Sequence, residues 1–170
     1  MRGETLSNVD YVNADLRGAD LSSANISGAD FRGANLRDTT WQRAVVNAEF
    51  ENAELNHADL RGSNFTFSDM RAADLRHVNA GPIEVADNEL IAATFDGVDF
   101  TGADLRGSVF RLALVVGTVF RDADLRGADL RRVMFVDEAH WEGAIYDETT
   151  MFDEEFDPLA RGMIRLGTEK

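Results

Sequence analysis

A period of five residues runs along almost the whole chain and constrains its fold more than any other feature. The centre of each five-residue unit is a large apolar residue, a small residue stands two positions before it, and the other three positions are polar. The centres run from Leu6 to Met151, with one step of four residues before Phe50 and one of six before Trp141. The most regular form of the unit, ADLRG, occurs at 14–18, 58–62, 103–107 and 123–127.

This spacing fits neither an α-helix nor a long flat strand. A helix requires apolar residues three and four apart, and a strand requires alternation throughout. A large and a small apolar residue two positions apart point to the same side of a short extended segment, and the polar residues that follow predict a turn. One such unit cannot bury its apolar side alone, so the units are expected to coil and stack.

The pattern resembles the pentapeptide-repeat family, whose motif is A(D/N)LXX, over roughly residues 4–151. The resemblance implies an all-β fold, a right-handed quadrilateral parallel β-helix (β-solenoid) with four units per coil. Residues twenty apart are then expected to stack, in about seven coils that each rise by about 4.8 Å. We therefore expect one repeat domain over residues 1–151 and a separate tail over 152–170.

Two segments depart from the repeat. Residues 76–90 contain Gly81 and Pro82, and Pro removes a donor from a strand ladder. Because the phase survives to Leu90, we expect the solenoid to continue through this irregularity; a projecting recognition loop is the alternative. In the tail, Asp157 as N-cap, Pro158 in the first turn and Gly162 as terminator predict a short C-terminal capping helix. A helix that binds a partner is the other interpretation of the tail.

Composition excludes several classes of protein. The 170 residues include no Cys, and 31 acidic residues outnumber 17 Lys and Arg to give a net charge of −14. A general nucleic-acid binder needs a basic face, so direct nucleic-acid binding is not expected. No apolar stretch is long enough to span a membrane, and the N-terminal residues lack the apolar region of a secretory signal, so we expect a cytoplasmic protein with no membrane partner.

The chain contains no recognisable catalytic motif, so we expect no enzyme, no cofactor and no bound metal. His57 and His77 stand one coil apart at equivalent repeat positions, which places them about 5 Å from each other. Two histidines alone make a poor zinc site because the third and fourth ligands are missing. We interpret both as corner residues of the coil.

One predicted face carries an unbroken ladder of acids. Its members each precede a repeat centre and are Asp10, Asp30, Glu49, Asp69 and Glu89. Some members of the pentapeptide-repeat family mimic DNA, bind type II topoisomerases such as DNA gyrase and protect against quinolones, so the resemblance implies this role for such a stripe. Arg32 and Arg71 dilute it, and a solvated face imposed by the repeat is the alternative.

Near the end of the repeat, apolar residues occupy positions that are polar elsewhere. These residues are Leu114, Val116, Met134 and Val136, and they predict an apolar outer patch. A contiguous exposed patch usually marks a contact. Four states of the patch are considered: the folded-back tail covers it, a homodimer forms through it, a partner protein binds it, or it stays in water.

Two functions remain from the sequence alone. The first is a non-enzymatic scaffold that binds a protein partner with its rigid faces. The second is a DNA-mimicking protein that binds DNA gyrase and protects it from quinolone-like inhibitors. The sequence does not identify the partner.

Overall fold

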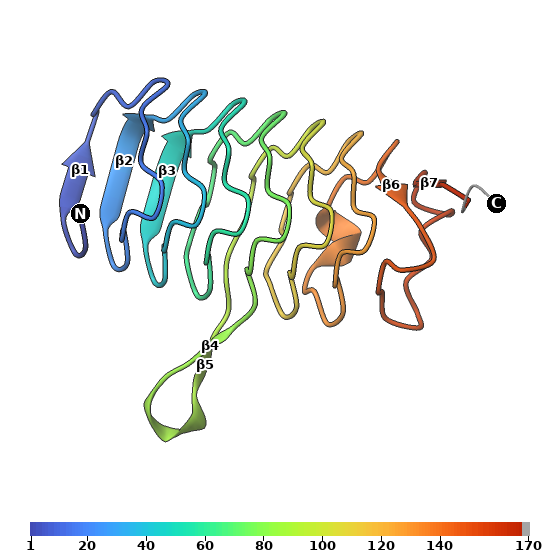
Figure 1. Ribbon diagram of the computed structural model, residues 1–170. Helices are drawn as coiled ribbons and strands as arrows, with labels where there is room; N and C mark the ends of the chain where they lie inside the picture. The colour runs from blue at the N-terminus through green and yellow to red at the C-terminus, as the bar shows by residue number, and fades with distance from the viewer. Residues whose placement is uncertain (168–170) are drawn as a thin grey trace.

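The computed structural model describes residues 1–167 as a rod of stacked coils, with the N-terminus at one end and the C-terminal tail at the other (Figure 1). Successive coils are joined by parallel bridges between residues about twenty apart, such as Asp10 with Asp30 and Asp104 with Asp124. Four columns of such bridges run along the rod, one for each side of a coil. The predicted parallel β-solenoid is confirmed.

Backbone hydrogen bonds on both sides of each unit hold the coils together. A repeat centre donates its N–H to the next coil, as Leu16 does to the carbonyl of Asn35 at 2.9 Å. The N–H of Asn35 donates back to the carbonyl of Ala14, also at 2.9 Å. Both polar backbone groups of each short side are therefore paired, as burial between coils requires.

Regular strands are confined to a few sides of the coils. Strands β1 (Thr5–Ser7), β2 (Asn25–Asp30) and β3 (Val45–Glu49) form a parallel sheet in that order. The register between β2 and β3 shifts after Ser27, so that Ala29 pairs with Ala48. This shift absorbs the four-residue step before Phe50 and keeps one side of the coil in place.

The corners of the coil explain the recurrent glycine. Each corner is a turn in which the small residue donates its N–H to the preceding centre, as Ala14 does to Tyr11 at 2.9 Å. The residue two positions after the centre has a positive φ at nearly every corner, for example 65° at Gly107. Glycine adopts this conformation without steric cost, and Asn and Asp tolerate it better than other residues.

The core contains the repeat centres and the small residues that precede them. Aromatic rings stack from coil to coil, as between Phe31 and Phe50 (5.0 Å between centroids) and between Phe100 and Phe120 (5.3 Å). A hydroxyl at a small position is satisfied locally: Ser63 donates to the carbonyl of Leu60. Among residues 1–167, no buried side-chain nitrogen or oxygen lacks a hydrogen-bond partner.

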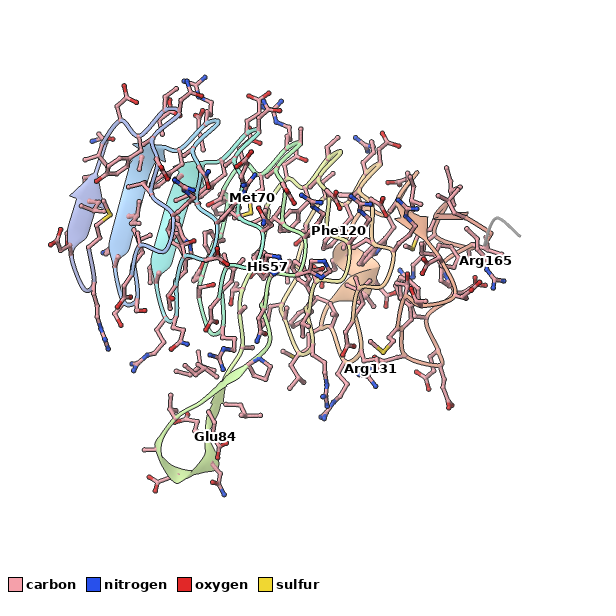
Figure 2. All side chains as sticks on the ribbon, viewed as in Figure 1. His57, Met70, Glu84, Phe120, Arg131 and Arg165 are labelled. Atoms are coloured by element: carbon pink, nitrogen blue, oxygen red, sulfur yellow. The ribbon has the colours of Figure 1, made fainter. Side chains whose placement is uncertain are left out.

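The expected passage of the solenoid through residues 76–90 is wrong, and a projecting hairpin replaces it. Strands β4 (Ile83–Glu84) and β5 (Leu90–Ile91) pair antiparallel around the 3₁₀ turn η1 (Ala86–Asn88). The hairpin extends away from the coils in Figure 1, and Figure 2 places Glu84 on it, apart from the rod. Leu90, expected to be a buried centre, is 54% exposed.

Bridges across the hairpin span thirty residues, from Asn64 to Thr94 and from Asn79 to Val109. Ten residues have therefore left the coil, and because ten is two repeat units the phase of the pattern is unchanged. The residue that follows Met70 in its stack is therefore Phe100 and not Leu90. The backbone N–H of Met70 donates to the carbonyl of Asp99, the residue before Phe100.

The tail does not form the predicted capping helix. Asp157 accepts the backbone N–H groups of Leu159 and Ala160, as an N-cap does. The turn that follows covers only residues 158–162 and ends at Gly162, whose φ is 76°. Strand β7 (Ile164–Arg165) then pairs in parallel with β6 (Ile145–Tyr146), which leaves no room for a longer helix. The 3₁₀ turn η2 (Val136–Glu138) completes the elements of this end.

Leu75 and Leu90 both stand at centre positions of the repeat, but only Leu90 lies on the hairpin. Leu75 is fully buried in the coil. Leu75→Asp is expected to destabilise the fold by more than about 4 kcal/mol, because an unpartnered charge replaces a packed side chain. The matched control Leu90→Asp, on the exposed hairpin, is expected to leave Tm nearly unchanged in thermal unfolding by circular dichroism. Equal losses for the two variants would contradict the described path of the chain.

Removal of residues 82–91 tests whether the hairpin is an insertion into a continuous repeat. The deletion brings Ala80 and Phe95 to a spacing of five residues, the regular step between centres. We expect a folded protein whose Tm is equal or higher, because a loop that costs closure entropy is gone. Deletion of only 82–90 breaks the phase and is expected to lower Tm; equal Tm values for both deletions would count against an insertion in register.

Candidate interaction faces

The acid ladder exists, with one member replaced. Asp10, Asp30, Glu49 and Asp69 follow one another through direct bridges along one side of the rod. The next residue in the column is Asp99 and not Glu89. Glu89 is wrong as a member because it lies between η1 and β5 on the projecting hairpin. Glu89 and Asp99 occupy the same position within the five-residue unit, so the spacing of the repeat alone did not distinguish them.

Arginines neutralise part of the ladder. Arg32 donates to Asp30 through Nε at 2.9 Å and also lies 3.6 Å from Glu49. Arg71 donates to Asp69 at 2.9 and 2.6 Å. The hydrogen bond from Arg32 lowers the pKa of Asp30; burial raises the pKa of Asp69, but the bonds from Arg71 outweigh it and the net pKa is lowered. Asp30 and Asp69 are therefore ionised at neutral pH, and each is paired with an arginine in the middle of the column.

Two of the four predicted apolar patch residues stack as expected. Leu114 and Met134 form a bridge on one outer side of the rod, and Met134 is 37% exposed. Val116, half-buried, follows on the same side and donates its N–H to Asp96. Val136 is wrong as a member of the outer patch: it packs against the core at the end of the solenoid.

The irregular step before Trp141 explains the different position of Val136. Phe135 has φ 65° and is 50% exposed, although the repeat places a buried centre there. The chain turns outward at this residue, so the following η2 turn directs Val136 towards the end of the core. Of the four states considered for the patch, cover by the tail applies to Val136, whose carbonyl accepts from Arg161 of the tail. It does not apply to Met134 or Phe135, which stay in contact with solvent.

The patch belongs to a longer surface with hardly any charge. The column that contains it has no acid or base at the bridging position; its members are Thr5, Asn25, Val45, Asn64, Thr94, Leu114 and Met134. We call this side the uncharged face. Two further apolar side chains on it were missed from the sequence: Val45 is 52% exposed and Phe67 is 73% exposed. Both signals were present, since Val45 occupies a position that is usually Asp or Asn, and Phe67 a corner that favours glycine.

Phe67 sits against the next coil in an ordered position. A Cβ on Gly97 would meet the Phe67 ring at 2.5 Å, so only glycine leaves room for the ring. The ring borders a groove of about 330 Å³, which Asn47, Ala48 and Arg32 also line. The exposed aromatic is therefore held at the corner between the uncharged face and the acid ladder.

The histidines form a corner pair, as predicted. The rings of His57 and His77 stack with centroids 5.1 Å apart and planes 12° from parallel. In residues 1–167, no three His, Asp or Glu side chains gather in a manner that would hold a metal ion. Within the same part of the chain, no helix has the length and apolar character required to cross a membrane.

Aromatic residues of the tail close the C-terminal end. Phe156 contacts Trp141 edge-on at 5.4 Å, and Phe152 contacts Tyr146 edge-on at 5.7 Å. Met163 is buried beside them. This end of the rod is thus covered by a turn, a strand and an aromatic cluster, in place of the predicted helix.

Repeat, core and corners together define a β-solenoid built from stacked five-residue units. The model of the pentapeptide-repeat family matches residues 5–38, 46–79 and 89–111, in eight copies. These segments make up more than half of the chain, and the protein belongs to the pentapeptide-repeat family. No curated protein has a significantly similar sequence.

Solved structures of the same fold are similar at low identity. Full-length QnrB1, a plasmid-mediated fluoroquinolone resistance protein, is 16% identical over 96% of this chain and 92% of its own, with a TM-score of 0.33. Rfr23 from the cyanobacterium Cyanothece 51142 is 19% identical over 88% and 91%, with a TM-score of 0.34. HetL from Nostoc sp. strain PCC 7120 is 21% identical over 94% and 84%, with a TM-score of 0.27. Similarity at this level carries no conclusion about function.

Proposed function

We propose that the protein is a non-enzymatic scaffold that binds a protein partner through the uncharged face. One observation carries the proposal: this face combines exposed Val45, Phe67 and Met134 with neutral polar side chains, whereas acids and arginines occupy much of the other sides. Apolar side chains within a charge-poor surface are typical of the core of a protein–protein interface.

The rod is suited to rigid presentation of such a surface. Each coil is hydrogen-bonded to its neighbours through the backbone, and its interior is filled by stacked aromatic and aliphatic side chains. Side chains on one face therefore keep fixed spacings of about 4.8 Å along the rod. A partner that matches this spacing binds without ordering the scaffold, which reduces the entropic cost of association.

A photo-cross-linking amino acid tests the face directly. Benzoylphenylalanine in place of Phe67 is expected to capture a discrete partner in the native host, because this position borders the uncharged face. The control position is Val12, an exposed apolar residue on the side of the acid ladder. Capture from Val12 and not from Phe67 would overturn the proposal and favour the acidic side.

The second candidate is the DNA mimic that binds DNA gyrase. The observation in its favour is the continuous column of Asp10, Asp30, Glu49, Asp69 and Asp99. B-DNA carries one charge per about 1.7 Å of axis, whereas the column offers one carboxylate per about 4.8 Å. Arg32 and Arg71 neutralise its middle. The scaffold is favoured for this reason.

Gyrase supercoiling separates the two functions. A scaffold is expected to leave supercoiling and quinolone inhibition unchanged at micromolar concentration. A DNA mimic would change them, and the Asp30→Lys/Glu49→Lys double variant would abolish the effect and its salt dependence. Glu148→Lys/Glu154→Lys is the control, since it makes the same change of charge at exposed positions outside the ladder. An effect of the unaltered protein that the ladder variant removes and the control retains would contradict the scaffold.

A further inference from the structure

The coil that contains β3 lacks one corner residue, and this leaves a groove in the side of the rod. The coils before and after it each have a residue with positive φ at this corner, Gly28 at 67° and Phe67 at 59°. Between them, the four-residue step from Val46 to Phe50 omits the corner. The floor of the groove, whose volume is about 330 Å³, consists of residues on both sides of the missing corner: Gly28, Ala29, Asn47 and Ala48.

Side chains supply the hydrogen bonds that the missing corner would have made. At a complete corner, the residue with positive φ donates its N–H to the next coil, as Phe67 does at 2.9 Å. Where the corner is missing, the side-chain amide of Asn47 donates to the Thr66 carbonyl at 3.2 Å. Ser68 Oγ accepts the backbone N–H of Ala48 at 3.3 Å. The groove is therefore a hydrogen-bonded feature of the solenoid and not a local break in it.

One wall of the groove is the ring of Phe67, which the backbone holds in a strained conformation. A φ of 59° is an outlier for a bulky residue, and many other corners of the rod have glycine. The ring lies against Gly97 of the next coil, whereas the rest of the groove belongs to its own and earlier coils, so its other side faces the groove. The side chain is 73% exposed and buries little apolar surface. Strain without such a gain is typical of functional sites.

The opposite wall carries more acid than base. Asp30, Glu49 and Asp69 line the groove together with Arg32. Two of these carboxylates are occupied, since Asp30 accepts from Arg32 at 2.9 Å and Asp69 accepts from Arg71 at 2.9 Å. Glu49 differs, because its contact with Arg32 is 3.6 Å, longer than a hydrogen bond, and its side chain is 60% exposed. Glu49 is therefore the carboxylate that can pair with a positive group from outside.

An exposed ring and an available carboxylate in one groove suit a guanidinium group. This flat, weakly hydrated cation stacks on aromatic faces, and its fork of N–H donors forms two parallel hydrogen bonds with a carboxylate. A lysine ammonium is a compact, strongly hydrated charge and matches a ring face less well. The surplus of acids disfavours an anionic group such as a phosphate.

We propose that the groove binds an arginine side chain of the protein partner, with the guanidinium stacked on Phe67 and paired with Glu49. This site rests on the proposed scaffold function, because the groove borders the uncharged face and adds a charged contact at its edge. Charge pairs fix the register of an interface. The arginine therefore sets the position of the partner along a face that is otherwise nearly without charge.

Nα-acetylarginine amide is the probe, and Nα-acetylcitrulline amide, its neutral isostere, is the control. In an NMR titration, the arginine compound is expected to cause saturable shifts of the backbone amide signals of Asn47, Phe67 and Gly97. The citrulline compound is expected to bind at least ~5-fold more weakly, because it lacks the cation–π and ionic contacts. Equal binding of Nα-acetyllysine amide would indicate a general attraction to an acidic protein and would overturn the site, as would the absence of saturable shifts.

A change at the corner itself tests the ring. Phe67→Gly is expected to abolish binding of the arginine compound and to stay folded, because glycine adopts the φ of this corner without steric cost. Its matched control is Ala72→Gly, which alters another exposed corner with φ 53° and leaves the ring in place. Thermal unfolding checks the fold of both variants. Retained binding in Phe67→Gly would refute the site.

A second variant tests the carboxylate. Glu49→Gln is expected to weaken binding of the arginine compound several-fold, because the ionic contact is lost while the shape of the side chain is kept. Glu148→Gln removes the same charge at an exposed position outside the groove and is expected to bind as the unaltered protein does. Equal affinities of the two variants would contradict the pair with Glu49.

The arginine contact and the scaffold function fail under different results. Capture of a partner from position 67 without binding of the arginine compound removes the arginine contact and leaves the uncharged face as the binding surface. Binding of the compound without capture of any partner supports the guanidinium site and counts against the scaffold. Dilution of the protein without any probe is the remaining check: if it shifts the same amide signals, a second copy of the chain occupies the groove and the arginine site is wrong.

Discussion

The hydrogen bonds between neighbouring coils are the interaction on which the rest of the structure depends. Each short side has too few residues to form a stable strand alone, and it becomes ordered only because both backbone groups pair with the next coil. Leu16 with Asn35 and Asn35 with Ala14 show the two directions of this pairing. The spacing between coils, the stacking of rings and the chemistry of each outer face all follow from it.

Many charged side chains on the outside of the rod stabilise the local backbone of the solenoid. An Asp before a centre accepts the backbone N–H two residues on and binds the Arg that carries it, as Asp74 does with Arg76. Burial raises the pKa of Asp74, but the bonds from Arg76 more than offset this, and its pKa is lowered. The same arrangement recurs at Asp104 with Arg106. An acid at this position therefore stabilises its own turn, and a row of acids is weak support for DNA mimicry.

For the same reason, the lack of charge on the uncharged face is more informative about binding than the presence of acids elsewhere. On the uncharged face the repeat dispenses with its Asp–Arg pairs and places Val45, Leu114 and Met134 at the outward positions instead. Loss of those pairs removes local stabilisation of the turns. The strands β1 to β3, which begin on this face, supply pairing of greater length in the N-terminal half. The solenoid forms without Asp–Arg pairs on this face, so its outward apolar side chains favour a role in binding over a role in stability.

The amino-acid sequence by itself determined the solenoid, its inward and outward positions, the His57–His77 stack and the first four members of the acid ladder, because all of these depend on a period that is local to the chain. Only the tertiary structure decided which coil each residue belongs to after residue 80. A hairpin of two repeat lengths leaves the phase intact, so Asp99 replaces Glu89 without a trace in the pattern. The outward turn at Phe135 and the pairing of β7 with β6 were decided in the same way, since the open end of a stack is closed by contacts between segments and not by any local preference.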